Sequence, residues 1–237
     1  MAQVKVKASD GHEFSAYTAS PAGKAKGSVV VIQEIFGVNP HIRSVADGYA
    51  AQGYFAIAPQ IFDRAEADVE LGYEAQEDFD KGLKLAFQDI ALTDALKDIQ
   101  AAVNLASEHG RVGVVGYCYG GLLTWLSACE VTGVTAASAY YGGGIAGEKE
   151  RTPQCPIIMH FGEKDAHIPM SDVDAIKAAH LDIPVYVYDA DHGFNCDVRG
   201  SYDQPASATA LERTLTFFSK HIDPLDDQGD QTVVMKN

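Results

Sequence analysis

Apolar residues in this chain follow two patterns, short continuous runs and longer stretches with helical spacing. Continuous runs of this kind are typical of strands buried on both faces of a parallel sheet, and they lie at 28–33, 54–58, 112–115, 134–140, 157–161 and 185–189. The stretches with helical spacing lie between them or after them, at 41–52, 89–106, 171–180 and 207–220. Residues 60–81 show no clear period. The alternation predicts a mostly parallel sheet with helices on both faces.

The N-terminal segment differs, because two alternating runs at 2–8 and 12–19 flank the turn Ser9-Asp10-Gly11. This pattern predicts a hairpin that gives the sheet an antiparallel edge. The expected fold class is therefore α/β, with roughly eight strands. We expect a single domain over residues 1–222, followed by a polar tail at 223–237.

The composition restricts the partners more than the fold. The chain has 237 residues and a net charge of −15, which argues against nucleic acid and anionic membrane as partners. It contains no apolar run as long as a membrane span and lacks the apolar core of a signal peptide. We therefore expect a cytoplasmic protein with a small-molecule partner. The acidic charge and the lack of an exposed apolar stripe favour a monomer.

Four cysteines are present: Cys118, Cys129, Cys155 and Cys196. Their spacing is typical of neither a zinc site nor a small disulfide scaffold, so we predict reduced thiols and no metal. Cys118 stands apart because it lies in Gly116-Tyr-Cys-Tyr-Gly120, directly after a predicted buried strand. A nucleophile between two glycines, on a sharp turn from strand to helix, is the elbow of the α/β-hydrolases, here with cysteine in place of serine. The positive end of the helix that follows favours a thiolate.

A nucleophilic thiol requires a base and a group that orients the base. His192 follows the last predicted strand and lies in a loop between Asp191 and Gly193. A histidine in such a loop is poorly placed to pack in the core, so a functional role is favoured. Asp165 follows the preceding strand and is the preferred acid, with Glu163 and Asp191 as competitors. The chain order nucleophile, acid, histidine is that of α/β-hydrolases.

The remaining histidines are weaker candidates. His167 follows a strand end, where it could contact a substrate, and His41 begins a predicted helix near the Glu34 loop. His160 lies inside a strand and is expected in the core. The others are expected at the surface: His12, His109, His180 and His221.

Glu34 directly follows the predicted strand 28–33, which should place its carboxylate at the same sheet edge as Cys118. It could be a solvated loop carboxylate. Alternatively, it could compete for the thiol proton and keep Cys118 protonated until a substrate arrives, which would protect the thiol from oxidation.

Several segments together resemble the dienelactone hydrolase (carboxymethylenebutenolidase) family, and the resemblance runs from about residue 3 to 220. The segments are Gln33-Glu-Ile-Phe-Gly37, Gly116-Tyr-Cys-Tyr-Gly-Gly121, Tyr140-Tyr-Gly142, Gly162-Glu-Lys-Asp165 and His192-Gly-Phe194. The resemblance implies an α/β-hydrolase fold and a Cys118–His192–Asp165 triad that cleaves ester or lactone bonds without a cofactor. It also implies that Glu34 switches the thiol, and that the backbone N–H groups of Ile35 and Tyr119 form the oxyanion hole.

The family pattern is broken where members that cleave dienelactones hold the substrate carboxylate with arginines. Here Glu77 and Cys196 stand at those positions. Lys81 and Arg199 are nearby candidates to replace them, but lysine does not reproduce a bidentate arginine. The remaining expected substrate contacts come from the family segments, and they are Phe36, Tyr141 and Phe194.

Two alternative functions stay open at this point. One is a thiol redox sensor or binding protein on the same fold without hydrolysis. The other is a hydrolase of a different acyl bond, such as a thioester.

Overall fold

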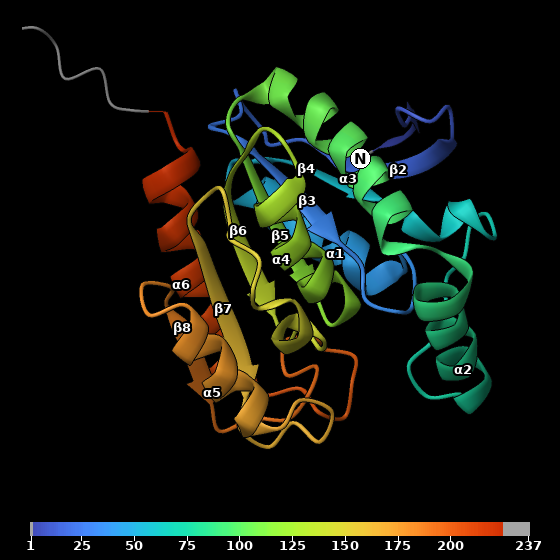
Figure 1. Ribbon diagram of the computed structural model, residues 1–237. Coiled ribbons are helices and arrows are strands. Elements are labelled where there is room, and N and C mark those ends of the chain that lie inside the picture. The colour runs from blue at the N-terminus through green and yellow to red at the C-terminus, as the bar shows by residue number, and fades with distance from the viewer. Residues whose placement is uncertain (1, 225–237) are drawn as a thin grey trace, which may run out of the picture.

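The computed structural model describes residues 2–224, which form an eight-stranded sheet in the order β1-β2-β4-β3-β5-β6-β7-β8 (Figure 1). The strands are β1 Ala2–Lys7, β2 Glu13–Ala19, β3 Ser28–Ile32, β4 Phe55–Pro59, β5 Val112–Tyr117, β6 Val134–Tyr140, β7 Ile157–Gly162 and β8 Val185–Tyr188. β2 is antiparallel to both β1 and β4, and every pairing from β4 to β8 is parallel. The predicted fold class, including its antiparallel edge, is confirmed.

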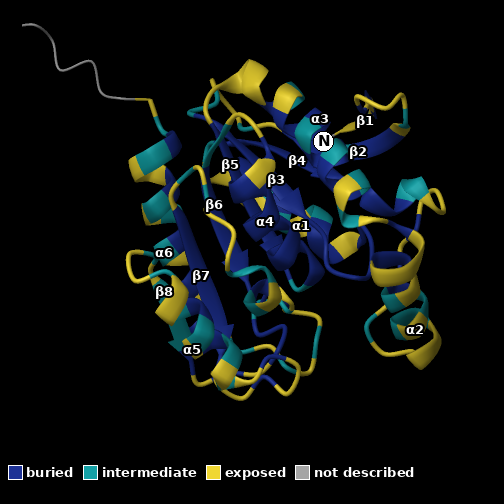
Figure 2. Ribbon diagram, in the orientation of Figure 1, coloured by how far each residue is buried: buried dark blue, intermediate teal, exposed yellow. Residues whose placement is uncertain are grey.

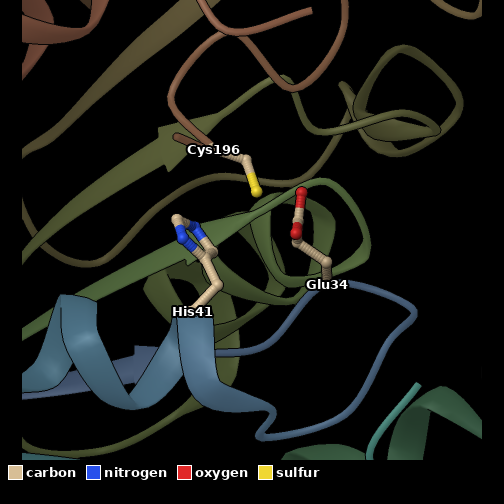
Figure 3. Close-up of side chains that lie close together, drawn as sticks. All are labelled: Glu34, His41 and Cys196. Carbon is tan, nitrogen blue, oxygen red and sulfur yellow. The ribbon is translucent and has the colours of Figure 1, made fainter. Parts of the chain in front are cut away.

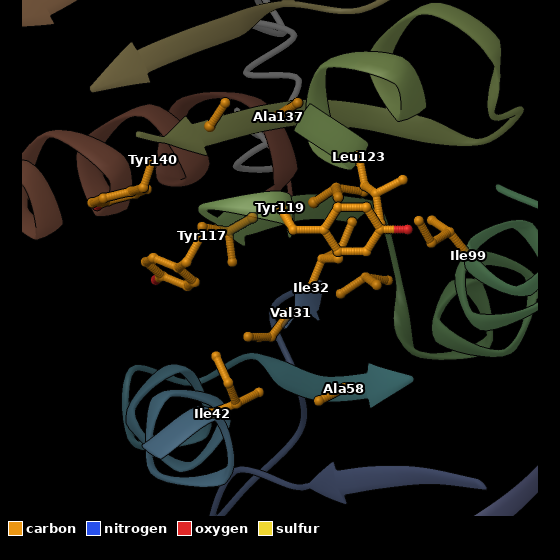
Figure 4. Packing of buried hydrophobic residues seen from close by; sticks show 14 of the residues in the cluster. Val31, Ile32, Ile42, Ala58, Ile99, Tyr117, Tyr119, Leu123, Ala137 and Tyr140 are labelled. Carbon is orange, nitrogen blue, oxygen red and sulfur yellow. The ribbon is translucent and has the colours of Figure 1, made fainter. Parts of the chain in front are cut away.

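The apolar runs form strands because both faces of the sheet are covered. Every residue of β3, β4, β5 and β7 is buried, and the central strands are dark blue along their length in Figure 2. Helices α3 (Leu92–Ala106) and α4 (Tyr119–Glu130) pack on one face, and α1 (Pro40–Ala51) and α6 (Gln204–Ile222) on the other. Figure 4 shows Ile42 of α1 and Ile99 of α3 directed into this core from opposite sides of the sheet.

The remaining elements are short. They are the helix α5 (Met170–Ala179), the 3₁₀ turns at Ile61–Arg64, Ser107–His109 and Ile145–Glu148, the helix α2 (Gln76–Lys84) and the π-helical turn η2 (Leu85–Asp89). Among the described residues, no helix is both long enough and apolar enough to cross a membrane.

The structure corrects the sequence-based assignment between residues 60 and 92. Helix α2 begins within the segment 60–81 that showed no clear period, and the helix expected from residue 89 begins at Leu92. The helix starts later because Ile90 and Ala91 have extended backbone, which separates η2 from α3. Asp89 therefore belongs to η2, and Asp94 is the acidic residue in the first turn of α3.

The C-terminal helix is longer than predicted, because Asp203 caps it by accepting a hydrogen bond from the Ala206 N–H at 2.9 Å. Asp223, the first residue of the predicted polar tail, accepts a hydrogen bond from the Tyr54 hydroxyl at 2.7 Å. Residues 225–237 of the predicted tail lie outside the described part of the chain.

Candidate active site

Cys118 occupies the turn between β5 and α4 in a backbone conformation that L-residues rarely adopt. Its φ is 55° and its ψ is −115°. Such strain persists only where the surrounding structure imposes it, and it is often found at functional sites. Close approaches between backbone segments hold the turn in this conformation. A Cβ atom at Gly116 would overlap the carbonyl oxygen of Gly120, and a Cβ atom at Gly120 would overlap the carbonyl oxygen of Ile32. The two glycines allow β5 and α4 to meet closely enough to raise Cys118 at the carboxyl edge of the sheet.

His192 and Asp165 form a side-chain pair at the same edge of the sheet. Both follow the carboxyl ends of their strands, β8 and β7, and His192 Nδ1 lies 2.7 Å from Asp165 Oδ2. The other oxygen of Asp165 accepts hydrogen bonds from the N–H groups of His167 at 2.8 Å and Ile168 at 3.1 Å. Because both carboxylate oxygens are engaged and the side chain is fully buried, Asp165 can hold the imidazole in one orientation.

The competing acids point elsewhere. Glu163 is exposed, and Asp191 accepts a hydrogen bond from the backbone N–H of His192 rather than from its ring. Burial opposes a charge on His192. The negative charge of Cys118 and the hydrogen bond to Asp165 outweigh burial and raise the pKa of His192 to about 10. The site therefore favours the imidazolium form of His192.

Ile35 and Tyr119, the two residues predicted to supply the oxyanion hole, both line the cavity that holds Cys118. Tyr119 is the first residue of α4, so its N–H has no partner within the helix. Ile35 lies in the loop after β3 and lines the cavity with Cys118 and Tyr119. Helix α2 packs closely on this loop, because Gly82 brings its backbone against the Ile35 carbonyl oxygen.

A cavity of about 330 Å³ opens above Cys118 and His192. This volume is in the range of small-molecule sites. Its wall is largely apolar and is formed by Phe36, Phe79, Leu83, Phe87 and Leu122. His167 and Arg199 supply polar groups, and the His167 ring contacts that of His192 with a centroid separation of 5.2 Å.

Glu34 is fully buried rather than solvated. Its Oε2 accepts a hydrogen bond from the Tyr73 hydroxyl at 2.8 Å, and its Oε1 lies 3.5 Å from Arg199 Nη1. Burial opposes the charge of Arg199, but the surrounding negative groups, with Glu34 the largest contributor, together outweigh burial and raise the pKa of the guanidinium. Burial, together with the charge of Glu34, raises the pKa of Tyr73, so this hydroxyl stays a donor.

Three of the expected substrate contacts lie away from the cavity wall. Lys81 extends toward Glu66, with 2.6 Å between Nζ and Oε1, because Phe79 and Leu83, two residues to either side, face the cavity. Tyr141 and Phe194 are fully buried and pack against each other, with a centroid separation of 5.3 Å.

Tyr141 packs on His192 instead, since its ring centroid lies 5.1 Å from that of His192. Of the five expected contacts, Phe36 and Arg199 line the cavity.

Sequence reasoning missed the contribution of α2 and η2. Phe79, Leu83 and Phe87 recur every four residues, which is the signal that could have revealed a helical face directed at the site. His41 was expected near the Glu34 loop, and it is buried there at the start of α1. His160 is in the core as predicted, where burial lowers its pKa to about 3.

The sheet order, the strand–turn–helix at Cys118 and the cavity at the carboxyl ends of the strands define an α/β-hydrolase. The family model described as "Dienelactone hydrolase family" matches residues 14–222. The chain thus belongs to the dienelactone hydrolase family, and it is a hydrolase of the ester and lactone type.

Individual relatives agree with this assignment. A Synechocystis protein assigned as a carboxymethylenebutenolidase is 35% identical, over 89% of this chain and 93% of its own. The carboxymethylenebutenolidase of Pseudomonas putida is 31% identical, over 91% of this chain and 95% of its own. The crystal structure of a Klebsiella pneumoniae protein assigned as a dienelactone hydrolase is similar with a TM-score of 0.77 and 29% identity, covering 93% of this chain and 100% of that one.

Proposed function

We propose that the protein hydrolyses carboxylic esters or lactones through a thioester on Cys118, with His192 and Asp165 as the other members of the triad. The observation that carries this proposal is the strained backbone of Cys118 beside a His192–Asp165 pair whose Nδ1–Oδ2 separation is 2.7 Å. A buried structural cysteine would require neither the strain nor the pair.

The reaction follows from these positions. The Cys118 thiolate forms an S–C bond with the substrate carbonyl, and the carbonyl π electrons move to oxygen. The N–H groups of Ile35 and Tyr119 stabilise that oxyanion, and losing one such donor typically costs about 10²–10³ in rate. When the C–O bond to the leaving group breaks, the imidazolium of His192 protonates the alkoxide. Neutral His192 then takes a proton from the water that attacks the thioester carbonyl. The C–S bond breaks as the carbonyl re-forms, which releases the acid and regenerates the Cys118 thiolate beside the imidazolium.

Glu34 is the group that we assign to gating the thiol. It is fully buried at the sheet edge that carries Cys118, and its Oε1 makes no hydrogen bond among the described residues. A carboxylate with one unsatisfied oxygen can exchange the Arg199 contact for the proton of the thiol. Substrate entry would then set whether Cys118 is a thiol or a thiolate.

The cavity favours a substrate whose acyl part is largely apolar, because aromatic and aliphatic side chains form most of its wall. Its cation, Arg199, is already compensated by Glu34. A substrate carboxylate would have to compete with Glu34 for this guanidinium. Neutral lactones should therefore be turned over with kcat/KM within about tenfold of matched lactones that carry a carboxylate. A preference above a hundredfold for the charged lactone would contradict this assignment.

The test of the nucleophile is Cys118→Ala, with Cys155→Ser as the matched control because Cys155 lies outside the cavity lining. We expect turnover of 4-nitrophenyl acetate to disappear in the first variant and to remain in the second. Wild-type turnover in Cys118→Ala would show that another group attacks the ester.

The gate has its own test in the alkylation of the resting enzyme. In the resting enzyme Glu34 competes with His192 for the thiol proton. In Glu34→Gln this competition is lost and the proton can pass to His192, so Cys118 should react faster with iodoacetamide than in the wild type. An unchanged alkylation rate would exclude Glu34 as the gate and would leave the triad assignment intact.

A further inference from the structure

Three side chains with metal-binding atoms converge beside the active site, from three separate parts of the chain. Glu34 follows β3, His41 lies in the first turn of α1, and Cys196 lies on the loop between β8 and α6. All three are buried, and one ligand atom from each lies within 4.8 Å of the others. Figure 3 shows the carboxylate, the imidazole and the thiol directed at a common space.

Two atoms of this cluster lack the partners that buried polar atoms normally have. Glu34 Oε1 and His41 Nε2 are buried, and neither forms a hydrogen bond within the described residues 2–224. An unsatisfied buried polar atom typically costs about 1–3 kcal/mol. Both atoms are therefore available to an additional ligand at this place.

The other nitrogen of His41 is already engaged. Its Nδ1 lies 3.0 Å from Oδ1 of Asp197, whose side chain is 63% exposed. When Nδ1–H donates to this carboxylate, the lone pair is on Nε2, which is the unpartnered nitrogen. A histidine bound to a carboxylate through one nitrogen and to a metal through the other is the usual arrangement in metalloproteins.

The donor set selects the type of ion. One carboxylate oxygen, one imidazole nitrogen and one thiolate sulfur suit zinc, whereas magnesium and calcium prefer oxygen ligands alone. Zinc bonds of about 2.0–2.3 Å place tetrahedral donors about 3.3–3.8 Å apart, so the most distant pair here must approach by about 1 Å. A water molecule would complete the four ligands.

Arg199 is a positive charge that would repel a bound cation, since its Nη1 lies 3.5 Å from Glu34 Oε1. The formal charges nevertheless balance. A divalent ion and Arg199 together carry three positive charges, matched by Glu34, Asp197 and the Cys196 thiolate. The thiol proton leaves for solvent when the sulfur–metal bond forms.

We propose that Glu34, His41 and Cys196 form a binding site for a zinc-like divalent cation, oriented by Asp197. Because Glu34 is the carboxylate assigned above to the gate, a bound cation would hold it at the cluster and withdraw it as a proton acceptor. This consequence, unlike the site itself, rests on the proposed function. Micromolar zinc should then slow ester turnover, and a chelator should restore it.

The experiment uses Co²⁺ as a spectroscopic probe, since a thiolate–cobalt bond gives a charge-transfer band that does not depend on turnover. We expect the band at one equivalent in the reduced wild-type protein, in Cys118→Ser and in the control Cys155→Ser, and its loss in Cys196→Ser. Asp197→Asn alters only an exposed side chain and should weaken cobalt binding by about 10–100-fold.

Two results would overturn the site. One is a wild-type protein without a stoichiometric band, and the other is a band that persists in Cys196→Ser but vanishes in Cys118→Ser, which would place the metal on the catalytic pair. The regulatory consequence is tested separately by zinc inhibition in Asp197→Asn. It would be refuted if the inhibition constant stayed unchanged while cobalt binding weakened.

Discussion

Gly82 offers a direct test of whether helix α2 positions the proposed oxyanion hole. Its Cα faces the loop that carries Ile35, and an added Cβ atom would overlap the Ile35 carbonyl oxygen and lie 3.3 Å from the Ile35 Cβ. The added Cβ would lie 2.1 Å from that oxygen, so in Gly82→Ala the two backbones must separate by about 1.4 Å to reach the normal distance between non-bonded atoms, about 3.5 Å. The displaced loop would carry the Ile35 N–H away from the oxyanion.

The expected size of the effect follows from this displacement. A misplacement of about 1 Å at a reacting centre can lower the rate by about 10²-fold, equivalent to about 2.7 kcal/mol of transition-state stabilisation. Overpacking should reduce the free energy of unfolding by about 1–3 kcal/mol, and alanine's higher helix propensity returns about 1 kcal/mol. The loss of transition-state stabilisation, about 2.7 kcal/mol, should therefore exceed the net loss of folding stability, about 0–2 kcal/mol.

Gly48→Ala is the matched control, because Gly48 lies in α1 and an added Cβ would contact nothing within 4 Å. It should stabilise the protein by about 1 kcal/mol and leave activity unchanged. Both variants are compared by kcat/KM on a neutral 4-nitrophenyl ester and by urea unfolding. If Gly82→Ala retained the wild-type kcat/KM, α2 would have no part in positioning the Ile35 loop.

Three further predictions concern the triad and the core. In the proposed triad Asp165 orients the imidazole, so Asp165→Asn should lower kcat by about 10²–10⁴-fold, and a loss smaller than tenfold would contradict this role. Burial opposes the charge of His192, but Cys118 and Asp165 raise its pKa to about 10. Stability from this protonation is complete below the unfolded pKa of about 6.5 and is lost as the pH rises toward 10. Cys118→Ala should therefore reduce the difference in unfolding free energy between about pH 6 and pH 10, and an unchanged difference would refute this coupling. Asp98 is fully buried and binds Arg64 through both oxygens at 2.8 Å, so Asp98→Ala should destabilise the fold by about 3–5 kcal/mol in urea unfolding. A loss below about 1 kcal/mol, as expected for an exposed ion pair, would contradict the importance of this pair.

The strands could be predicted from the sequence because a strand covered on both faces needs apolar residues at every position. Val29 to Ile32 and Val112 to Val115 have this property, and all eight of these positions are buried. Gly113 is the one glycine among them, and a Cβ atom added there would lie 3.1 Å from Ile222 and 3.2 Å from Phe218. The turn at Cys118 was equally readable, since the close approach of two backbones demands glycine at 116 and 120.

Helix α2 was not readable, because much of it faces solvent and only one narrow stripe is apolar. Phe79 and Leu83 point to the cavity, while Glu77 and Asp80 are exposed. The periodicity of such a helix is weak, although its position decides the shape of the site. The same geometry explains why Lys81, close to the site in sequence, pairs with Glu66 instead.

The sequence by itself determined what depends on neighbouring residues: the strands, the turn that raises Cys118, and the chain order of thiol, acid and histidine. The tertiary structure alone decided which distant groups meet. It buried Glu34 against Tyr73 and Arg199, and it brought His41 and Cys196 to the same place. Cysteine spacing predicted no metal site because it registers only ligands that are close in the chain. The three proposed ligands come from separate elements, and only the packing of α1 and the β8–α6 loop on the sheet brings them within 4.8 Å of one another.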